Sequence, residues 1–181
     1  MKTVRVRDKD FRLFLTPQQI ETRVQELADT LNQEYVGKRP ILLPILNGAF
    51  LFAADLIRRL NVQPELQFIR VSSYGKSMQS SGKVELLVGL DIDIEDRHVL
   101  IVEDIVDSGL TFDYVKEYLT QKKAASVEIV SLLFKEANFK GKNLPRYVGY
   151  NIPPAFVVGY GLDYAQSGRE LDGIYTVVEE E

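Results

Sequence analysis

The sequence contains no cysteine and a single histidine, His98, among its 181 residues. The missing cysteines exclude disulfide frameworks, cysteine-based zinc sites and thiol nucleophiles. One histidine excludes a histidine-rich metal site, and a Ser-His-Asp triad would depend on that residue alone. Basic residues are not in surplus either, since 22 Lys and Arg stand against 26 Asp and Glu, a net charge of −4. The chain therefore lacks the positive charge expected of a duplex nucleic-acid binder, and its chemistry must come from carboxylates, glycines and loops.

Long hydrophobic runs are missing as well. The longest apolar runs, such as Ile41–Leu46, are far too short to span a membrane. No apolar signal-peptide segment follows the charged residues at the N-terminus. The length fits one domain that buries about 70% of its unfolded surface, and no linker or repeat divides residues 1–181. We therefore expect a single cytoplasmic domain with no membrane partner.

Helix and strand patterns alternate along the chain. Thr16 and Pro17 have the pattern of an N-cap and a first-turn proline, apolar residues follow at helical spacing, and Gly37 fits a helix stop. Further helices are expected at residues 50–60 and 110–121. Apolar runs predict strands at 41–46, 66–73, 84–90, 99–102, 127–134, 155–158 and 173–178. This alternation predicts an α/β domain with a mostly parallel central sheet.

The edge of the sheet formed by the carboxyl ends of its strands is where a ligand is expected. Parallel α/β sheets bind their ligands at this edge, near a switch in strand order. Residues that directly follow each strand are therefore the candidates for a site. The polar, glycine-containing stretch at 74–83 predicts a mobile loop at the same edge.

The most informative motif runs from residue 99 to residue 112. Four apolar residues are followed by Glu103 and Asp104, where the strand is expected to end. Neighbouring strand residues point to opposite faces, so both carboxylates can meet one ligand only if the strand opens into a loop there. Asp107 to Thr111 then form a small, hydroxyl-rich turn that leads into a helix.

This turn has the composition of a phosphate site. Backbone N–H groups, the hydroxyls of Ser108 and Thr111, and the helix dipole would together hold a phosphate. The two carboxylates beside it would repel an anion unless they bind sugar hydroxyls or a divalent cation. A phosphorylated sugar bound with Mg²⁺ satisfies all of these groups, whereas the simpler alternative is a capped strand-to-helix turn with solvated acids.

Residues 103–111 resemble the phosphoribosyl-pyrophosphate signature of the type I phosphoribosyltransferases. Other segments resemble the hypoxanthine (hypoxanthine-guanine) phosphoribosyltransferases: 73–75, 132–135 and 152–164, followed by Arg169. The similarity covers the chain from about Asn47 to Arg169. It implies a single-domain phosphoribosyltransferase-like fold, a mostly parallel sheet flanked by helices, with a small hood and a mobile active-site loop.

The resemblance also implies a role for each matching residue in holding phosphoribosyl pyrophosphate. Ser108, Gly109, Leu110 and Thr111 would hold the 5′-phosphate. Glu103 and Asp104 would hold the ribose hydroxyls, directly or through Mg²⁺, and Asp163 would bind a second Mg²⁺. The pyrophosphate would be held by Arg169 and the turn of Leu46, Asn47 and Gly48.

The residues implied at the purine form a second set. Asp107 would be the general base at purine N7, and Lys135 would donate a hydrogen bond to purine O6. Phe156 would stack on the ring, and the backbone of Val157 would meet the edge of the base. Ser73 and Tyr74 would belong to the loop that closes over the reaction.

One residue departs from the family pattern. Many relatives have Leu-Lys-Gly in the pyrophosphate turn, whereas this chain has Asn47 at the central position. A site built from backbone N–H groups survives this change, but any contribution from a side-chain cation at position 47 is lost.

The resemblance thus implies a Mg²⁺-dependent purine salvage enzyme. It would transfer phosphoribosyl from phosphoribosyl pyrophosphate to N9 of hypoxanthine, and also of guanine, and it would form a homodimer or homotetramer. Two alternatives stay open: the same reaction on another base such as xanthine, and an RNA-binding regulator built on the same fold. Two features argue against RNA binding: the net negative charge, and the lack of a basic cluster longer than Arg58-Arg59 or Lys122-Lys123.

Overall fold

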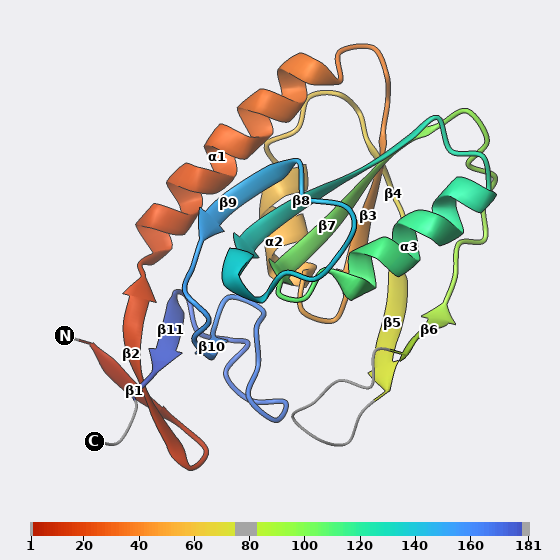
Figure 1. Cartoon of the computed structure of the whole chain (residues 1–181). Coiled ribbons are helices and arrows are strands. Elements are labelled where there is room, and N and C mark those ends of the chain that lie inside the picture. Colours follow the sequence, from red (N-terminus) through yellow and green to blue (C-terminus); the bar gives the residue numbers. More distant parts are fainter. Residues whose placement is uncertain (1, 75–82, 179–181) are drawn as a thin grey trace.

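The computed structural model describes residues 2–74 and 83–178, with the side chains at 72–74 and 83–85 left aside. Its centre is a seven-stranded sheet in the order β6-β5-β3-β7-β8-β9, with β4 paired to β3 as well (Figure 1). Every described pairing in it is parallel except that of β5 with β6. The strands are β3 Ile41–Leu46, β4 Glu65–Leu66, β5 Ile69–Tyr74, β6 Lys83–Val88, β7 His98–Val106, β8 Ser126–Phe134 and β9 Tyr147–Asn151. The predicted α/β fold with a mostly parallel sheet is confirmed.

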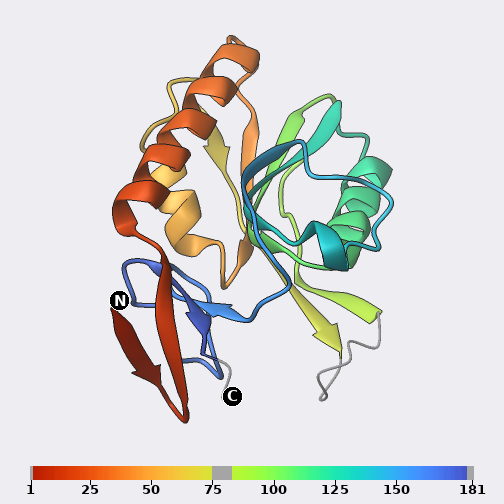
Figure 2. The same cartoon turned by 60° about the vertical axis from the view of Figure 1, so that its left-hand side comes forward.

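Helices cover both faces of this sheet (Figure 2). Helices α1 (Pro17–Glu34) and α2 (Phe50–Ile57) pack on one face, and α3 (Leu110–Gln121) packs on the other. Alternate residues of the central strands belong to two apolar clusters, one on each face of the sheet. Leu100 packs in the cluster with α1 and α2, and Ile101 packs in the cluster with α3. Burial on both faces explains why these strands are continuous apolar runs in the sequence.

The first helix begins as its sequence predicts. The Thr16 hydroxyl accepts a hydrogen bond from the Gln19 N–H, and the Gln19 side chain accepts one from the Thr16 N–H, which makes a capping box. Pro17 occupies the first turn, and the chain passes through Gly37 at φ +72° shortly after the helix ends. Among the described residues, no helix is both long and apolar enough to cross a membrane.

A second, antiparallel sheet lies beyond the carboxyl ends of the central strands, on the side of β9 (Figure 1). Its order is β1-β2-β11-β10, with β1 Thr3–Val6, β2 Lys9–Leu15, β11 Ile174–Val177 and β10 Val157–Val158. Phe11, Val158 and Tyr175 form its small core with Val6. This sheet is the predicted hood, and it joins the first and last strands of the chain. The hairpin of β1 and β2 was not predicted.

Several boundaries differ from the sequence prediction. The expected strand at 66–73 is divided into β4 and β5, and β9 was not predicted. The most consequential difference is in β7, which was expected to end at Val102 but continues to Val106. Its pairing with β8 extends to Val106 opposite Phe134, and this non-local ladder keeps the chain extended. Glu103 and Asp104 therefore lie within a strand and not in the loop after it.

Candidate active site

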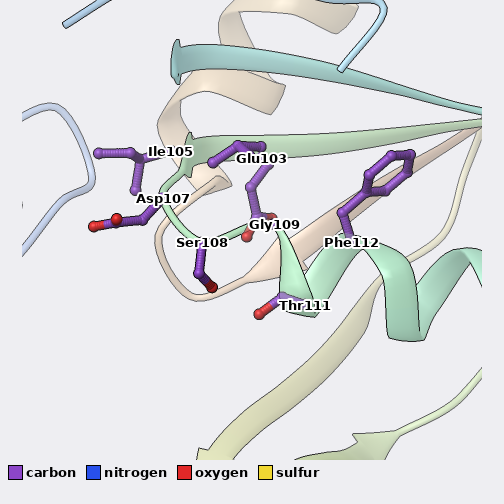
Figure 3. A pocket seen from close by; sticks show the side chains of 8 residues that line it. Glu103, Ile105, Asp107, Ser108, Gly109, Thr111 and Phe112 are labelled. Carbon is purple, nitrogen blue, oxygen red and sulfur yellow. The ribbon is translucent and has the colours of Figure 1, made fainter. Parts of the chain in front are cut away.

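A phosphate-sized pocket lies where β7 turns into α3 (Figure 3). It has a volume of about 90 Å³, and the side chains of Ser108 and Thr111 point to the same side of the turn. The pocket is lined by Glu103, Ile105, Val106, Asp107, Ser108, Gly109, Thr111 and Phe112. The structure thus brings together one of the predicted carboxylates and the predicted phosphate turn.

Gly109 gives this turn its shape. It is the N-cap of α3, with a φ of +80°, a left-handed conformation that favours glycine. A Cβ at this position would also collide with the ring of Phe139. Gly109 supplies no capping side chain, and the Leu110 N–H makes only a long bond, 3.4 Å, to the Ser108 hydroxyl. The N–H groups of the first turn of α3 can therefore bind an anion, and the helix dipole adds to the attraction.

Glu103 is partly buried beside the phosphate turn, and its Oε2 atom is inaccessible to solvent. Its Oε2 atom has no hydrogen-bond partner within the described part of the chain. Burial, and secondly the charge of Asp104, raise the pKa of Glu103 well above its ordinary value. A buried carboxylate without a donor is costly, so this atom is suited to a ligand hydroxyl or a cation.

Asp104 is partly buried and has different neighbours. Its Oδ1 accepts a hydrogen bond from the Ile105 N–H at 2.9 Å, and its carboxyl lies against Gly48, where a Cβ would collide with it. Burial raises the pKa of Asp104 to about 6, with a further rise from Asp163, while Arg169 and backbone hydrogen bonds oppose the shift. The predicted pyrophosphate turn thus contacts one predicted ribose ligand directly.

The loop after β10 brings the remaining charged residues to the same place. Arg169 donates to the Gly161 carbonyl at 2.6 Å and pairs with Asp163 at 2.7 Å. Gly161, at φ +97°, packs so closely on the carbonyl of Gly48 that a Cβ would not fit. The turn of Leu46, Asn47 and Gly48, whose first peptide bond is cis, therefore lies between β7 and this loop.

The three predicted metal ligands do not form a preformed cage. Within residues 2–74 and 83–178, no three Asp, Glu, His or Cys side chains are grouped closely enough to hold a metal ion. Mg²⁺ is usually bound by one or two carboxylates together with substrate phosphates and water, so a cage is not required. The unpartnered Oε2 of Glu103 and the raised pKa of Asp104 fit this kind of site.

Asp107 is held by two donors from the segment that follows β8. Lys135 Nζ lies 2.8 Å from Oδ2, and Asn138 Nδ2 donates to Oδ1 at 2.8 Å. The Lys135 side chain is only 10% exposed, whereas that of Asp107 is 48% exposed. Asn138 was missed by the sequence analysis; its one signal is its place three residues after Lys135, in the 3₁₀ helix η1 (Glu136–Asn138). The two residues predicted to meet the purine are therefore paired with each other.

The hood contributes an exposed aromatic ring. Phe156, just before β10, is 46% exposed and makes an edge contact with Tyr164 at a ring-centroid distance of 5.6 Å. Phe11 supports it from β2 at 6.3 Å. The side chain of Val157 is buried, and its residue pairs with Thr176 of β11.

The residues predicted for the closing loop are placed only in part. Ser73 and Tyr74 are the last residues of β5, but their side chains are not among those described. Residues 75–82, which hold most of the predicted mobile loop, lie outside the described residues.

Comparison with known proteins identifies the family. The phosphoribosyl transferase domain matches residues 14–165. The chain is 43% identical over 160 residues to the hypoxanthine-guanine phosphoribosyltransferase of Bacillus subtilis, covering 88% of this chain and 89% of that protein. The enzyme of the same name from Mycobacterium tuberculosis is 42% identical over 171 residues, 91% of this chain and 85% of that protein.

A solved structure agrees with this assignment. The hypoxanthine phosphoribosyltransferase of Staphylococcus aureus superposes with a TM-score of 0.88 and 39% identity, covering 92% of this chain and 91% of that chain. The matched residues 14–165 include the phosphate turn and the paired Asp107 and Lys135. The chain belongs to the phosphoribosyltransferase family and, within it, to the hypoxanthine-guanine phosphoribosyltransferases.

Proposed function

We propose that this protein transfers a phosphoribosyl group from phosphoribosyl pyrophosphate to N9 of hypoxanthine and guanine, releasing pyrophosphate. The observation that carries the proposal is the Asp107 and Lys135 pair, with a nitrogen-to-oxygen distance of 2.8 Å, directly beside the phosphate turn. A 6-oxopurine offers a hydrogen-bond donor at N7 and an acceptor at O6. It can therefore replace the bond between Lys135 and Asp107 with two bonds, one from N7 to Asp107 and one from Lys135 to O6.

Three parts of the site would divide phosphoribosyl pyrophosphate between them. The N–H groups at 108–111, with the Ser108 and Thr111 hydroxyls, would bind the 5′-phosphate. Although both lie in β7, Glu103 lines the pocket and the Asp104 carboxyl lies against Gly48, so they would accept hydrogen bonds from the ribose hydroxyls from two different sides. Arg169 and the backbone of the turn at 46–48 would bind pyrophosphate, which requires no cation at Asn47.

Glu103, Asp104 and Asp163 are the residues that would hold Mg²⁺ together with this substrate. When bound, Mg²⁺ would supply positive charge that neutralises the substrate anions and stabilises the departing pyrophosphate. The cost of keeping two buried carboxylates ionised would then fall, because a bound cation reverses the local charge balance.

The purine would bind between the hood and the end of β8. Phe156 would stack on the ring, which contributes about 1–3 kcal/mol by analogy with bases in nucleic-acid sites. Stacking does not distinguish one purine from another, so selectivity must come from the edge of the base. Lys135 would leave Asp107 to donate to O6; adenine has an amino group at this position, and Lys135 would lose its bond to Asp107 without gaining an acceptor.

The reaction would proceed by displacement of pyrophosphate from the ribose. N9 attacks C1′ of the ribose, the bond from C1′ to the pyrophosphate oxygen breaks, and its electron pair leaves with pyrophosphate. Asp107 takes the proton from N7, a contribution that is typically about 10²–10⁴-fold in rate. Positive charge that develops on the ribose lies near Glu103 and Asp104, and Arg169 stabilises the leaving group.

Formation of IMP tests this proposal. Purified protein is incubated with hypoxanthine, phosphoribosyl pyrophosphate and Mg²⁺, and IMP is separated and quantified, with a chelator in a parallel sample. Asp107→Asn is compared with Asp91→Asn, a matched change at an exposed aspartate that does not line the pocket. We expect IMP at similar rates from the native protein and Asp91→Asn, IMP formation about 10²–10⁴-fold slower from Asp107→Asn, and loss of product with the chelator. No IMP from the native protein would refute the proposed function.

A cytoplasmic location and a homodimeric or homotetrameric state complete the proposal. The location and the oligomeric state are inferred from the sequence and from its resemblance to the phosphoribosyltransferases. Light scattering of the purified protein measures the assembly, and a monomeric mass would contradict that part.

A further inference from the structure

Two donors hold Asp107, and they differ in what they can do when a base arrives. Lys135 has a long, flexible side chain and an alternative acceptor in purine O6. Asn138 has a short side chain on a folded turn, and its Nδ2 is 2.8 Å from Asp107 Oδ1. We propose that Asn138 is a positioning residue that keeps Oδ1 engaged throughout the reaction and leaves Oδ2 as the atom that takes the N7 proton. This inference rests on the proposed function, in which Asp107 is the base.

The backbone around Asn138 fixes its position. The Asn138 N–H donates to the Lys135 carbonyl at 3.1 Å, and the Phe139 N–H donates to the Glu136 carbonyl at 3.2 Å. One residue further on, the Lys140 N–H donates to the Ser108 carbonyl at 2.9 Å. The segment that carries Asn138 is thus bonded to the phosphate turn itself.

The same segment is anchored again on α3. The Asp113 carboxylate in the first turn of α3 accepts hydrogen bonds from the Lys142 N–H at 2.6 Å and from the Asn143 N–H at 3.1 Å. The Asn143 side chain adds a third bond, at 2.7 Å. The ring of Phe139 fills the space beside Gly109. Residues 135–143, which we call the clasp, therefore follow the turn from Asp107 to Asp113 and hold it in place before any ligand is bound.

The clasp explains how one oxygen can be released while the other is kept. When a base binds, Lys135 leaves Oδ2 for purine O6, and Oδ2 then faces the N7–H. Oδ2 takes this proton as N9 bonds to C1′ and the electron pair of the breaking C1′–O bond leaves with pyrophosphate. Without Asn138 the carboxylate could rotate, and a misplacement of about 1 Å can cost about 100-fold in rate.

Two substitutions separate hydrogen bonding from packing. Asn138→Ala removes the donor, and Asn138→Asp keeps the size and shape but replaces the donor with a negative charge beside Asp107. Glu136→Ala, an exposed residue in the same turn, is the matched control. Each variant is mixed with saturating phosphoribosyl pyrophosphate and Mg²⁺ and then with hypoxanthine, and the single-turnover rate of IMP formation is measured by rapid quench. Substrate affinity and thermal unfolding are measured in parallel.

We expect Asn138→Ala to slow the single-turnover rate by about 10- to 100-fold. Asn138→Asp should be slower still, while phosphoribosyl pyrophosphate affinity, melting temperature and the Glu136→Ala variant stay close to the native protein. An unchanged rate in Asn138→Ala would overturn the inference, as would an Asp variant faster than the Ala variant, because that order indicates packing. If the native protein forms no IMP, the proposed function fails and the inference fails with it; an active native protein with active Asn138 variants refutes the inference alone.

Discussion

Replacing Asp104 with Asn should make the ligand-free protein more stable while impairing it as an enzyme. Asp104 is partly buried, and its pKa is about 6 in the folded protein against an ordinary 3.8. The neutral form is therefore favoured on folding, and ionising this carboxyl costs about 3 kcal/mol more in the folded protein than in the unfolded chain. Asn has the same shape and no charge, and its Oδ1 can accept the hydrogen bond from the Ile105 N–H.

The sign of the pH dependence follows from the raised pKa. Below the ordinary value the group is protonated in both the folded and the unfolded chain, and it contributes no difference. As pH rises from about 4 to about 6 the unfolded chain loses the proton first, so stability falls across this range and then stays low. The Asn variant avoids this loss, and its advantage should be about 3 kcal/mol at about pH 8 and under about 1 kcal/mol at about pH 4.

Urea unfolding at a series of pH values measures this difference. The protein is kept free of divalent cations and phosphoribosyl pyrophosphate, since either would favour the ionised carboxylate. Asp91→Asn, at an exposed position, is the control and should stay within about 0.5 kcal/mol of the native protein at every pH. An Asp104→Asn variant that is less stable than the native protein at about pH 8, or whose advantage does not depend on pH, would refute the reasoning.

Three further predictions concern the chemistry. Asp107→Asn should slow a single turnover, measured by rapid quench, by about 10²–10⁴-fold and leave the affinity for phosphoribosyl pyrophosphate, measured by titration, close to native. Equal losses of rate and of affinity would contradict the role of Asp107 as a general base. Lys135→Met should weaken hypoxanthine binding and reduce the preference for hypoxanthine over adenine. An unchanged affinity for hypoxanthine, measured by calorimetry, would exclude the contact between Lys135 and O6. Gly48→Ala should destabilise the protein by about 1–3 kcal/mol, because its Cβ would collide with the Asp104 carboxyl, and it should weaken pyrophosphate binding; a native melting temperature and affinity would contradict this packing.

The parts of the fold that depend on local sequence were predictable. The N-cap at Thr16 and the helix at 110–121 are determined by neighbouring residues, and both predictions agree with the structure. The mostly parallel sheet also followed, because continuous apolar runs indicate strands buried on both faces. The hairpin of β1 and β2 was missed, since Phe11 and Leu15 are buried by pairing with the far end of the chain.

The candidate site was predictable as a set of residues but not as a set of contacts. Glu103 and Asp104 were expected in a loop, yet pairing with β8 holds them in a strand, where they have different neighbours. The bonds from Lys135 and Asn138 to Asp107 join residues 28 and 31 positions apart. No local pattern specifies such contacts, because they depend on how β7 and β8 are aligned.

Selection of a 6-oxopurine by the Asp107 and Lys135 pair is tested most directly by competition between bases. Hypoxanthine, guanine, xanthine and adenine are supplied together at equal concentration with phosphoribosyl pyrophosphate and Mg²⁺, and the four nucleotide products are quantified at low conversion. We predict that IMP and GMP dominate and exceed AMP by at least about 100-fold, because adenine leaves Lys135 without an acceptor. AMP in amounts similar to IMP, or no nucleotide at all, would contradict the role of this pair.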